Sequence, residues 1–344
     1  MFEQNLAIKV ISVNAKKVIE EIELLNLRDK KRRIVSRGDY VEIPIVNCDN
    51  LREVLSNISV DYEIVCQKNP VYSRPKSLEE ALEKIIEKNE LDKIRKYLPK
   101  TYKVLGDVIL VKMNDCLKNY AKEIGKALLE INPHCKSVWW DRGKRGAIRK
   151  PEVELIAGKG GETIHREGGC IYKFDVSKVM FSPGNQAERI RMGKIVGREV
   201  VVDMFAGIGY FTIPVAKKAK KVYAIEINPE SYHYLLENLK LNSVNSVVPI
   251  LGDSMYVTPE RVADRVIMGH VNCHEFLPVA INALKEKGWL HYHESVPEAV
   301  IERPVRRIIS AAEKEGKEVK IECVRKVKNY SPGVVHIVVD AYIY

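Results

Sequence analysis

Val200-Val-Val-Asp203-Met-Phe-Ala-Gly207-Ile-Gly209-Tyr-Phe-Thr-Ile is the stretch of sequence that decides the fold. A β-branched run that ends in an acidic residue predicts a buried strand, and the two glycines after it predict a tight turn into a helix. Such a turn lets a ligand lie against bare backbone, because glycine has no side chain to keep it away. The stretch therefore predicts the first strand and loop of a nucleotide-binding α/β sheet.

Two further acidic residues complete the pattern. Glu226 ends the stretch Val222-Tyr-Ala-Ile-Glu226, about 20 residues later, where the second strand of such a unit ends. A carboxylate at this place accepts hydrogen bonds from both ribose hydroxyls of a nucleoside. Asp253 follows a third apolar run, Val247-Val-Pro-Ile-Leu-Gly-Asp253. The set is typical of a class I S-adenosylmethionine (AdoMet) domain, so we expect AdoMet as the cofactor.

Two alternatives stay open at this point, a dinucleotide-binding Rossmann unit and a doubly wound sheet without a cofactor. A dinucleotide site uses G-x-G-x-x-G, whereas the third glycine position here holds Thr212. The three acidic positions favour AdoMet over both. The expected cofactor contacts are Ser182, Arg189, Asp203, Phe205, Gly207, Gly209, Glu226, Ile227, Asp253 and Ser254.

The segment that precedes the first sheet strand adds Ser182 and Arg189 to this set. Ser182-Pro-Gly predicts a turn, and the helix after it carries Glu188, Arg189 and Arg191. A hydroxyl and a guanidinium over the mouth of the first strand can hold the carboxylate of AdoMet's amino acid tail. The alternative is an ordinary capped helix with arginines on its surface.

Composition bounds the class of protein. The 344 residues carry a formal net charge of +10, which favours a polyanionic partner, although solvated basic faces are common. The 7 cysteines include no C-x-x-C pair, which indicates reduced thiols and neither a disulfide framework nor a zinc site. No apolar stretch approaches the ~18 residues of a membrane span, and the N-terminus lacks a signal-peptide pattern. We expect a cytoplasmic monomer that does not contact membranes.

Three domains are expected. Residues 1–72 form a small α+β domain, and the two prolines of Asn69-Pro-Val-Tyr-Ser-Arg-Pro75 mark a linker. Residues 77–175 form an α+β middle domain. In residues 176–344, strands alternate with helices, which predicts a doubly wound, Rossmann-like AdoMet-binding sheet whose last two strands are antiparallel.

The end of the fourth sheet strand is the expected place of chemistry. Enzymes that methylate nitrogen usually have Asn/Asp-Pro-Pro or Asn-Leu-Pro here, but this chain has Gly269-His270-Val. Nitrogen methylation is therefore not favoured. The catalytic candidates are His270, His274 and His293. Together with His291 they raise the alternative of a metal site. No carboxylate or cysteine falls at a suitable spacing to serve as a third ligand, so no metal is expected. A polar substrate pocket or core histidines are favoured.

A loop that joins tryptophan and basic residues is the candidate RNA surface. Tryptophan stacks on unpaired bases, and arginine and lysine meet phosphates. The alternative is a core tryptophan beside a solvated basic loop. The candidate residues are Trp139, Arg142, Lys144, Arg145 and Arg149.

From about residue 104 to the C-terminus, these motifs resemble a known family. It comprises archaeal enzymes of the wybutosine pathway that transfer the 3-amino-3-carboxypropyl group of AdoMet to tRNA. The matching stretches include Pro151-Glu-Val-Glu-Leu-Ile-Ala-Gly, Asp175-Val-Ser-Lys-Val-Met-Phe-Ser-Pro-Gly-Asn, His291-Tyr-His-Glu-Ser-Val and Tyr330-Ser-Pro-Gly-Val-Val-His336. Met-Gly in place of Asn-Leu-Pro separates the chain from the sister tRNA guanosine-37 N1-methyltransferases, although residues 1–70 look like the extra domain of that sister family.

The resemblance implies transfer to C7 of 4-demethylwyosine at position 37 of phenylalanine tRNA, in the anticodon loop, with methylthioadenosine as by-product. It also implies that Ser182, Arg189, Glu226 and Asp253 contact AdoMet, and it carries over no general base. With the resemblance, residues 1–72 become a candidate tRNA contact and residues 77–175 are expected to bind tRNA. Three alternatives stay open: methylation, either of N1 of guanosine 37 or of the tricyclic base, a bifunctional enzyme, and a non-catalytic tRNA-binding protein.

Overall fold

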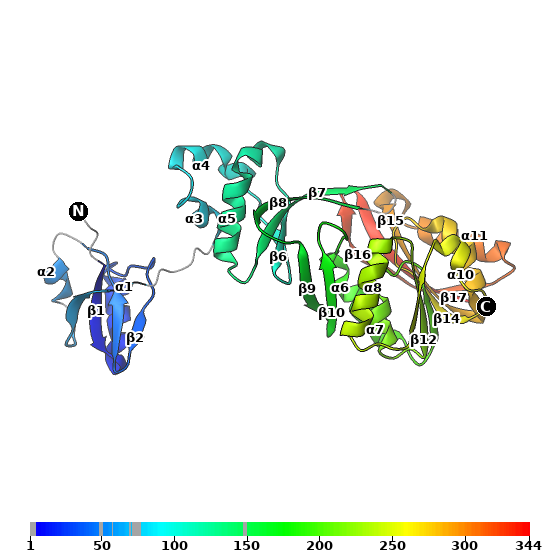
Figure 1. Ribbon diagram of the computed structural model, residues 1–344, viewed down its shortest axis with the longest axis horizontal. Coiled ribbons are helices and arrows are strands. Elements are labelled where there is room, and N and C mark those ends of the chain that lie inside the picture. The colour runs from blue at the N-terminus through cyan, green and yellow to red at the C-terminus, as the bar shows by residue number, and fades with distance from the viewer. Residues whose placement is uncertain (1–4, 48–50, 57, 69, 71–76, 147–149) are drawn as a thin grey trace. The chain divides into compact units, whose positions relative to one another are not determined.

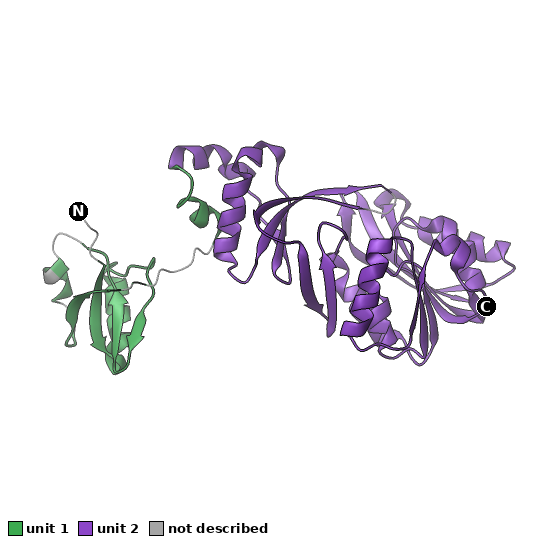
Figure 2. Cartoon of the chain, viewed as in Figure 1, with its two compact units in different colours: residues 1–87 green, residues 88–344 purple. Residues whose placement is uncertain are grey.

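The computed structural model describes residues 5–47, 51–56, 58–68, 70, 77–146 and 150–344. Most of the expected linker 69–75 lies outside these residues. The chain divides into two compact units, residues 1–87 and 88–344 (Figure 2), and each is described by itself below. The expected division of residues 77–344 into a middle and a C-terminal domain stays a prediction.

The first unit is built on an antiparallel sheet. Its strand order is β2 (Val35–Arg37), β3 (Tyr40–Pro44), β1 (Leu6–Ile11) and β4 (Glu63–Cys66). Helix α1 (Ala15–Leu24) buries Val18 and Ile22 in the core of this unit. The short helices α2 (Leu51–Leu55) and α3 (Leu78–Leu82) complete it.

The second unit begins with helix α4 (Lys88–Ile94) and a four-stranded sheet. The strand order is β5 (Tyr102–Leu105), β6 (Val108–Val111), β7 (Ser137–Arg145) and β8 (Lys150–Gly158). Helix α5 (Ala121–Ile131) packs against β7 and β8. A separate hairpin, β9 (Glu162–Glu167) and β10 (Cys170–Asp175), is attached to α8 (Pro229–Leu241), because Asn238 Oδ1 accepts a hydrogen bond from the Lys173 N–H at 2.7 Å.

A seven-stranded sheet forms the body of this unit (Figure 1). Its order is β13 (Val247–Leu251), β12 (Lys221–Glu226), β11 (Val200–Asp203), β14 (Ala263–Met268), β15 (Leu284–Pro297), β17 (Val334–Ile343) and β16 (Val319–Ser331). The first five strands are parallel, and β17 is antiparallel to both β15 and β16. The expected Rossmann-like sheet with two antiparallel final strands is confirmed.

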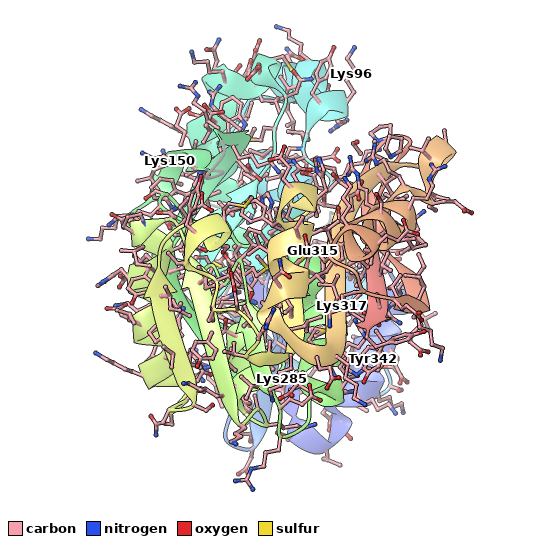
Figure 3. The ribbon with its side chains drawn as sticks, turned by 90° about the vertical axis from the view of Figure 1, so that its right-hand side faces the viewer. Lys96, Lys150, Lys285, Glu315, Lys317 and Tyr342 are labelled. Atoms are coloured by element: carbon pink, nitrogen blue, oxygen red, sulfur yellow. The ribbon has the colours of Figure 1, made fainter. Side chains whose placement is uncertain are left out.

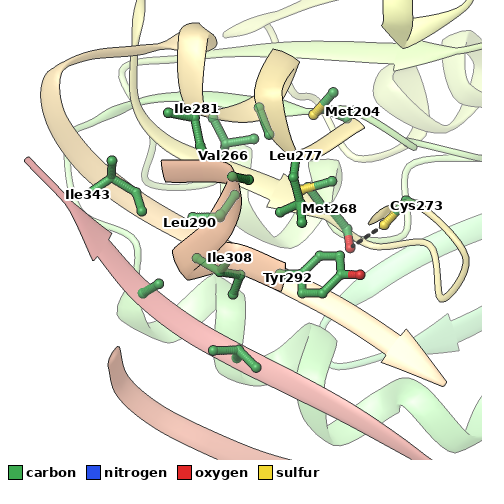
Figure 4. Close-up of a cluster of buried hydrophobic side chains, with 14 of the residues drawn as sticks. Met204, Val266, Met268, Cys273, Leu277, Ile281, Leu290, Tyr292, Ile308 and Ile343 are labelled. Atoms are coloured by element: carbon green, nitrogen blue, oxygen red, sulfur yellow. Dashed lines mark hydrogen bonds between the residues drawn. The ribbon is translucent and has the colours of Figure 1, made fainter. Parts of the chain in front are cut away.

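Helices cover both faces of this sheet (Figure 1). Helices α6 (Gln186–Ile195) and α7 (Thr212–Ala216) bury Met192 and Val215 against one face. On the other face, α10 (Leu277–Ala283) and α11 (Arg303–Lys314) bury Ile281 and Ile308 in the large core drawn in Figure 4. The sheet is thus buried on both sides, so a ligand can reach only its strand ends.

The two ends of the strands differ in character. At the amino ends of β14 and β15, Lys285 Nζ binds Asp264 Oδ1 at 2.6 Å, and Lys317 Nζ donates to the Glu286 carbonyl at 2.8 Å. Lys285 and Lys317 lie at the surface there (Figure 3). The carboxyl ends face a cavity. In the described ranges, the cysteines are free thiols and no helix has the length and apolar character needed to cross a membrane.

Candidate active site

A cavity of about 440 Å³ opens at the carboxyl ends of β11, β12, β13 and β14. Its size is typical of small-molecule sites. Segment 178–185 and the β16–β17 hairpin close its other side. Most of the predicted cofactor contacts line it, namely Ser182, Arg189, Phe205, Gly207, Glu226, Ile227, Asp253 and Ser254, together with the catalytic candidate His270.

Glu226 lies at the end of β12, where its carboxylate is fixed by backbone donors. Oε2 accepts a hydrogen bond from the Gly207 N–H at 2.7 Å, and Oε1 accepts one from the Asn228 N–H at 2.7 Å. Burial raises the pKa of this carboxyl, while the N–H donors oppose the rise. Each carboxylate oxygen keeps a second lone pair, so the group can still accept hydrogen bonds from a pair of ribose hydroxyls.

Asp203 and Gly209 are not among the lining residues and lie behind the loop. Asp203 Oδ2 accepts a hydrogen bond from the Thr212 hydroxyl at 2.7 Å, and Oδ1 accepts one from the Phe205 N–H at 3.3 Å. Complete burial raises the pKa of Asp203 to about 6. Gly209 has φ +101°, and a Cβ there would lie 2.6 Å from Ile213 Cδ1. Both residues therefore shape the turn that presents Gly207 to the cavity.

Asp253 and Ser254 begin the short helix α9 (Ser254–Val257) beside Glu226. Asp253 Oδ1 accepts a hydrogen bond from the Met255 N–H at 2.9 Å, which caps the helix. The Ser254 hydroxyl donates to the Met204 carbonyl and so ties α9 to the loop after β11. The loops after β11, β12 and β13 thus form one hydrogen-bonded wall.

Arg189 lines the cavity, but its guanidinium is already paired. Nε and Nη2 bind the two carboxylate oxygens of Glu167 at 2.6 and 2.8 Å, and Nη1 donates to the Ser182 carbonyl at 3.0 Å. Arg189 and Glu167 are both buried. The sequence had not singled out Glu167, because it lies on the β9–β10 hairpin, far from Arg189 along the chain.

Lys328 is a further cavity residue that sequence reasoning missed. It lies on β16, and its Nζ donates to the Ser182 hydroxyl at 3.0 Å. Its side chain also lies against Gly184, where an added Cβ would be 3.1 Å from Lys328 Cδ. No motif could have indicated this contact, because it depends on the antiparallel pairing of β16 and β17.

The end of β14 supplies an aromatic and imidazole wall. His270 lies 5.6 Å from the ring of Phe205, which in turn meets Phe276 edge-to-face at 5.1 Å. Gly269 lies against Phe211, where a Cβ would be 2.8 Å from Cδ2 of that ring. Position 269 is therefore closed to any side chain unless Phe211 moves.

The other three histidines of the predicted set lie in three different environments. His274 is exposed in a 3-10 turn (His274–Phe276) and does not line the cavity. His291 is buried in an ion network, where it donates from Nδ1 to Asp340 at 2.6 Å and accepts from Arg265. His293 Nδ1 lies 3.0 Å from His336 Nε2, and His336 lines the cavity. Among the described residues, no group of three His, Cys, Asp or Glu side chains is placed to hold a metal ion.

The predicted RNA residues lie on the β7–β8 hairpin. Trp140 is buried with the Arg142 guanidinium 3.8 Å above its ring, whereas Trp139 is half-buried. Arg142 binds Glu154 at 3.0 Å, and Arg145 binds Glu152 at 2.9 Å. Lys144 donates to the Tyr330 hydroxyl at 3.0 Å, which connects the hairpin to the rim of the cavity. Arg149 lies outside the described residues.

Two models of known protein families match the second part of the chain. The model described as the TRM5/TYW2 methyltransferase domain matches residues 163–322, and the model described as the TYW2 N-terminal domain matches residues 78–161.

Two curated relatives differ in their extent. The chain is 50% identical over 246 residues to the Methanocaldococcus jannaschii tRNA(Phe) (4-demethylwyosine(37)-C(7)) aminocarboxypropyltransferase. The matched segment makes up 70% of this chain and 96% of that protein. The chain is 37% identical over 340 residues to the Pyrococcus abyssi tRNA (guanine(37)-N(1))-methyltransferase Trm5b, covering 97% of this chain and 98% of that protein.

One solved structure of a relative contains AdoMet. The crystal structure of M. jannaschii TYW2 in complex with AdoMet is 45% identical, with a TM-score of 0.59, and covers 71% of this chain and 99% of that chain. The similarity therefore extends over the whole of that AdoMet-bound protein.

Proposed function

The chain belongs to the TRM5/TYW2 family, and we propose that it transfers the 3-amino-3-carboxypropyl group of AdoMet to C7 of 4-demethylwyosine at position 37 of phenylalanine tRNA. The other product is methylthioadenosine. The observation that carries this proposal is the end of β14, where Gly269 packs against Phe211 and the expected amide-bearing motif Asn-Leu-Pro is absent. A site without a side chain at this position cannot grip a ring nitrogen through it.

The residues of the cavity fit AdoMet. This cofactor supplies a sulfonium with three electrophilic carbons, so the residues that orient it decide which group is transferred. Glu226, held by two backbone N–H groups, would bind the ribose hydroxyls. The loop of Gly207 would place backbone beside the nucleoside, and Asp253 and Ile227 would line the adenine end.

Lys328 and the Ser182 hydroxyl would hold the carboxylate of the transferred group. Their mutual hydrogen bond of 3.0 Å places an ammonium and a hydroxyl side by side at the cavity wall. Arg189, by contrast, has its guanidinium committed to Glu167 and to the Ser182 backbone, so it would position the serine. A carboxylate between an ammonium and a hydroxyl gains charge-assisted hydrogen bonds. That anchor would orient the carbon chain of the tail.

The β7–β8 hairpin would contact the tRNA. Its Lys144 reaches Tyr330 at the cavity rim, so a nucleotide that enters the cavity would pass beside this hairpin. Trp139 and the basic residues Arg142, Lys144, Arg145 and Arg149 are the proposed contacts. The net charge of +10 favours such a polyanionic partner. We also propose that the protein is a cytoplasmic monomer.

Product identification tests the proposed function. The protein is incubated with AdoMet and with phenylalanine tRNA that carries the tricyclic base, and the nucleoside products are separated by chromatography. Methylthioadenosine is expected to accumulate in step with modified tRNA. S-adenosylhomocysteine as the sole cofactor product would overturn the proposal.

N1-methylation of guanosine 37 is the second candidate function. The observation that favours it is the unit 1–87, because similarity to the methyltransferase Trm5b extends over 97% of this chain. Unmodified tRNA transcript with guanosine at position 37 separates the two candidates. Methyl incorporation into that transcript would support this second activity, and its absence would remove it.

A further inference from the structure

Two buried histidines face each other at the cavity wall, and the proposed contacts to AdoMet do not include them. His293 lies on β15 and His336 on β17, with side chains 0% and 1% exposed. His293 Nδ1 lies 3.0 Å from His336 Nε2, so a single proton joins the two rings. In the described part of the chain, the other nitrogen of His293, Nε2, is buried without a hydrogen-bond partner. Such a buried polar atom calls for an explanation.

The pair lies beside the position where the acceptor is expected. His336 lines the cavity together with Gly269, His270 and Tyr330. His293 meets the ring of Phe211 at 5.3 Å, and Phe211 is the residue against which Gly269 packs. The imidazole pair is thus joined through one aromatic ring to the end of β14.

The surroundings keep the His293 ring uncharged. Burial, followed by His291 and Arg191, lowers the pKa of His293 to about 3, although Asp340 opposes this shift. The Cys273 thiol, whose own pKa is raised by burial, lies near the His293 carbonyl at 3.7 Å. A neutral imidazole suits a cavity that binds a sulfonium, because an imidazolium beside that cation would repel it.

The proposed reaction requires a proton acceptor at this place. The inference rests on the proposed function, in which the attacking atom is a ring carbon that carries a hydrogen. We propose that His336, with His293 behind it, accepts the proton that leaves C7 of the acceptor base. His336 is then a catalytic residue, and His293 is a positioning residue.

Transfer of the group and loss of the proton conserve atoms and charge. The C7–Cγ bond forms as the S–Cγ bond breaks, and the electron pair of that bond leaves with the sulfur of neutral methylthioadenosine. The base ring is then a cation and gives its C7 hydrogen, as a proton, to Nδ1 of His336. The step uses the tautomer in which the Nε2–H of His336 donates to Nδ1 of His293, because Nδ1 of His336 then carries no hydrogen and can accept the proton. A cationic ring with a hydrogen on a saturated carbon is a strong acid, so a weakly basic imidazole is sufficient.

Single-turnover kinetics of three variants test the role of the pair. Enzyme saturated with AdoMet is mixed with tRNA that carries the tricyclic base, and methylthioadenosine is measured over time. His336→Ala is expected to lower the rate at least about 100-fold, the usual contribution of a general base. Its AdoMet dissociation constant, measured by calorimetry, should stay within about twofold of the original. His233→Ala is the matched control, because His233 is exposed on α8 and binds Glu237 at 3.6 Å.

Chemical rescue separates a base from a structural residue. Added imidazole should restore the rate of His336→Ala in proportion to the concentration of its neutral form, whereas His293→Ala should show a smaller defect. His336→Asn keeps a polar side chain but supplies no base, so it should be as slow as His336→Ala, and added imidazole should not be needed to keep its AdoMet affinity near that of the original. Nitrogen-15 NMR of the enzyme without cofactor should show the His293 ring neutral from about pH 5 to pH 8.

Three results would overturn the inference: an unchanged rate in His336→Ala, a loss of rate that imidazole does not restore, and an imidazolium signal of His293 within that pH range. Failure of the proposed function has a different signature, which is S-adenosylhomocysteine from the unmodified enzyme. Methylthioadenosine from the unmodified enzyme, with full activity in His336→Ala, would remove the histidine role alone.

Discussion

The two sides of the cavity are built in different ways. The cofactor side consists of the loops after β11, β12 and β13. Asp203 and Glu226 end their strands, and Gly207 and Asp253 follow within a few residues. The acceptor side joins segment 178–185, the end of β14 and the β16–β17 hairpin, which are far apart in sequence. The first side is fixed by local turn geometry, and the second by long-range strand pairing.

Substitutions on the two sides should therefore have different effects. On the cofactor side, each residue is held by hydrogen bonds to its own loop or to the adjacent one, so a single change removes a ligand contact and leaves the fold. On the acceptor side, a network of buried charges positions the elements. Loss of one member there leaves other charges buried without compensation.

The largest effect is expected from Asp340→Ala on the acceptor side. Asp340 binds His291 at 2.6 Å, Arg191 at 2.9 Å and Arg325 at 2.6 Å. Removal of one partner of a buried ion network costs about 3–5 kcal/mol of unfolding free energy. Denaturant unfolding of the second unit measures it. Glu298→Ala, which removes an exposed pair with Lys326, is the control with an effect near zero. A loss below about 1 kcal/mol would contradict the network's role.

Asp203 predicts a pH dependence of stability on the cofactor side. Its folded pKa of about 6 lies above the ordinary value of 3.8, so the folded state binds a proton more tightly than the unfolded state. This contribution is complete below about pH 4 and is lost as the pH rises through 6, a change of about 2–3 kcal/mol. The free energy of unfolding should be lower at the higher of the two pH values by this amount, and Asp203→Asn should remove the difference. An equal slope in the variant would assign the pH dependence to another group.

Glu226→Ala tests the cofactor side as a binding surface. The change removes the proposed ribose acceptor and leaves the Gly207 N–H without its 2.7 Å partner. Charge-assisted hydrogen bonds contribute ~1.5–3 kcal/mol each, so AdoMet affinity should fall at least about tenfold. Calorimetry gives the dissociation constant, and the exposed Glu260→Ala is the control. An unchanged constant would place the ribose elsewhere.

Lys328→Met tests whether the acceptor side holds the transferred group. AdoMet affinity should fall about tenfold, because a charge-assisted contact to the carboxylate is lost. Methylthioadenosine lacks that carboxylate, so its affinity should not change. Lys326→Met, two residues away and paired with Glu298, should affect neither ligand. Equal weakening of both ligands would show that Lys328 supports the cavity without touching the tail.

The smallest effect is expected on the β7–β8 hairpin. Replacement of Arg142, Lys144, Arg145 and Arg149 by alanine should make the salt dependence of tRNA binding shallower and leave AdoMet binding intact. The change should be less than four phosphate contacts would give, because Arg142 and Arg145 are paired with Glu154 and Glu152. Filter binding over a range of salt concentrations measures the slope. An unaltered slope would move the RNA surface elsewhere, for instance to residues 28–37.

Sequence reasoning was most successful where strand and turn patterns are local. The runs that end at Asp203 and Glu226 predicted adjacent parallel strands, and the structure pairs Asp203 with Ala224 in register. The same reasoning placed Arg189 on the carboxylate of AdoMet, without any sign that Glu167 would pair with it. A bidentate partner on another hairpin has no signature in a single sequence, because charge spacing reports only neighbours along one element.

The sequence by itself determined the doubly wound sheet, the glycine turn and the acidic residues at the strand ends, because these depend on alternation, backbone freedom and short spacing. The tertiary structure alone decided that Lys328 meets Ser182 and that His293 meets His336. Both contacts depend on the register of β17 between β15 and β16, in which His336 lies opposite Ser295 and Lys328. A shift of one residue in that pairing would turn these side chains to the other face of the sheet, and no local pattern records it.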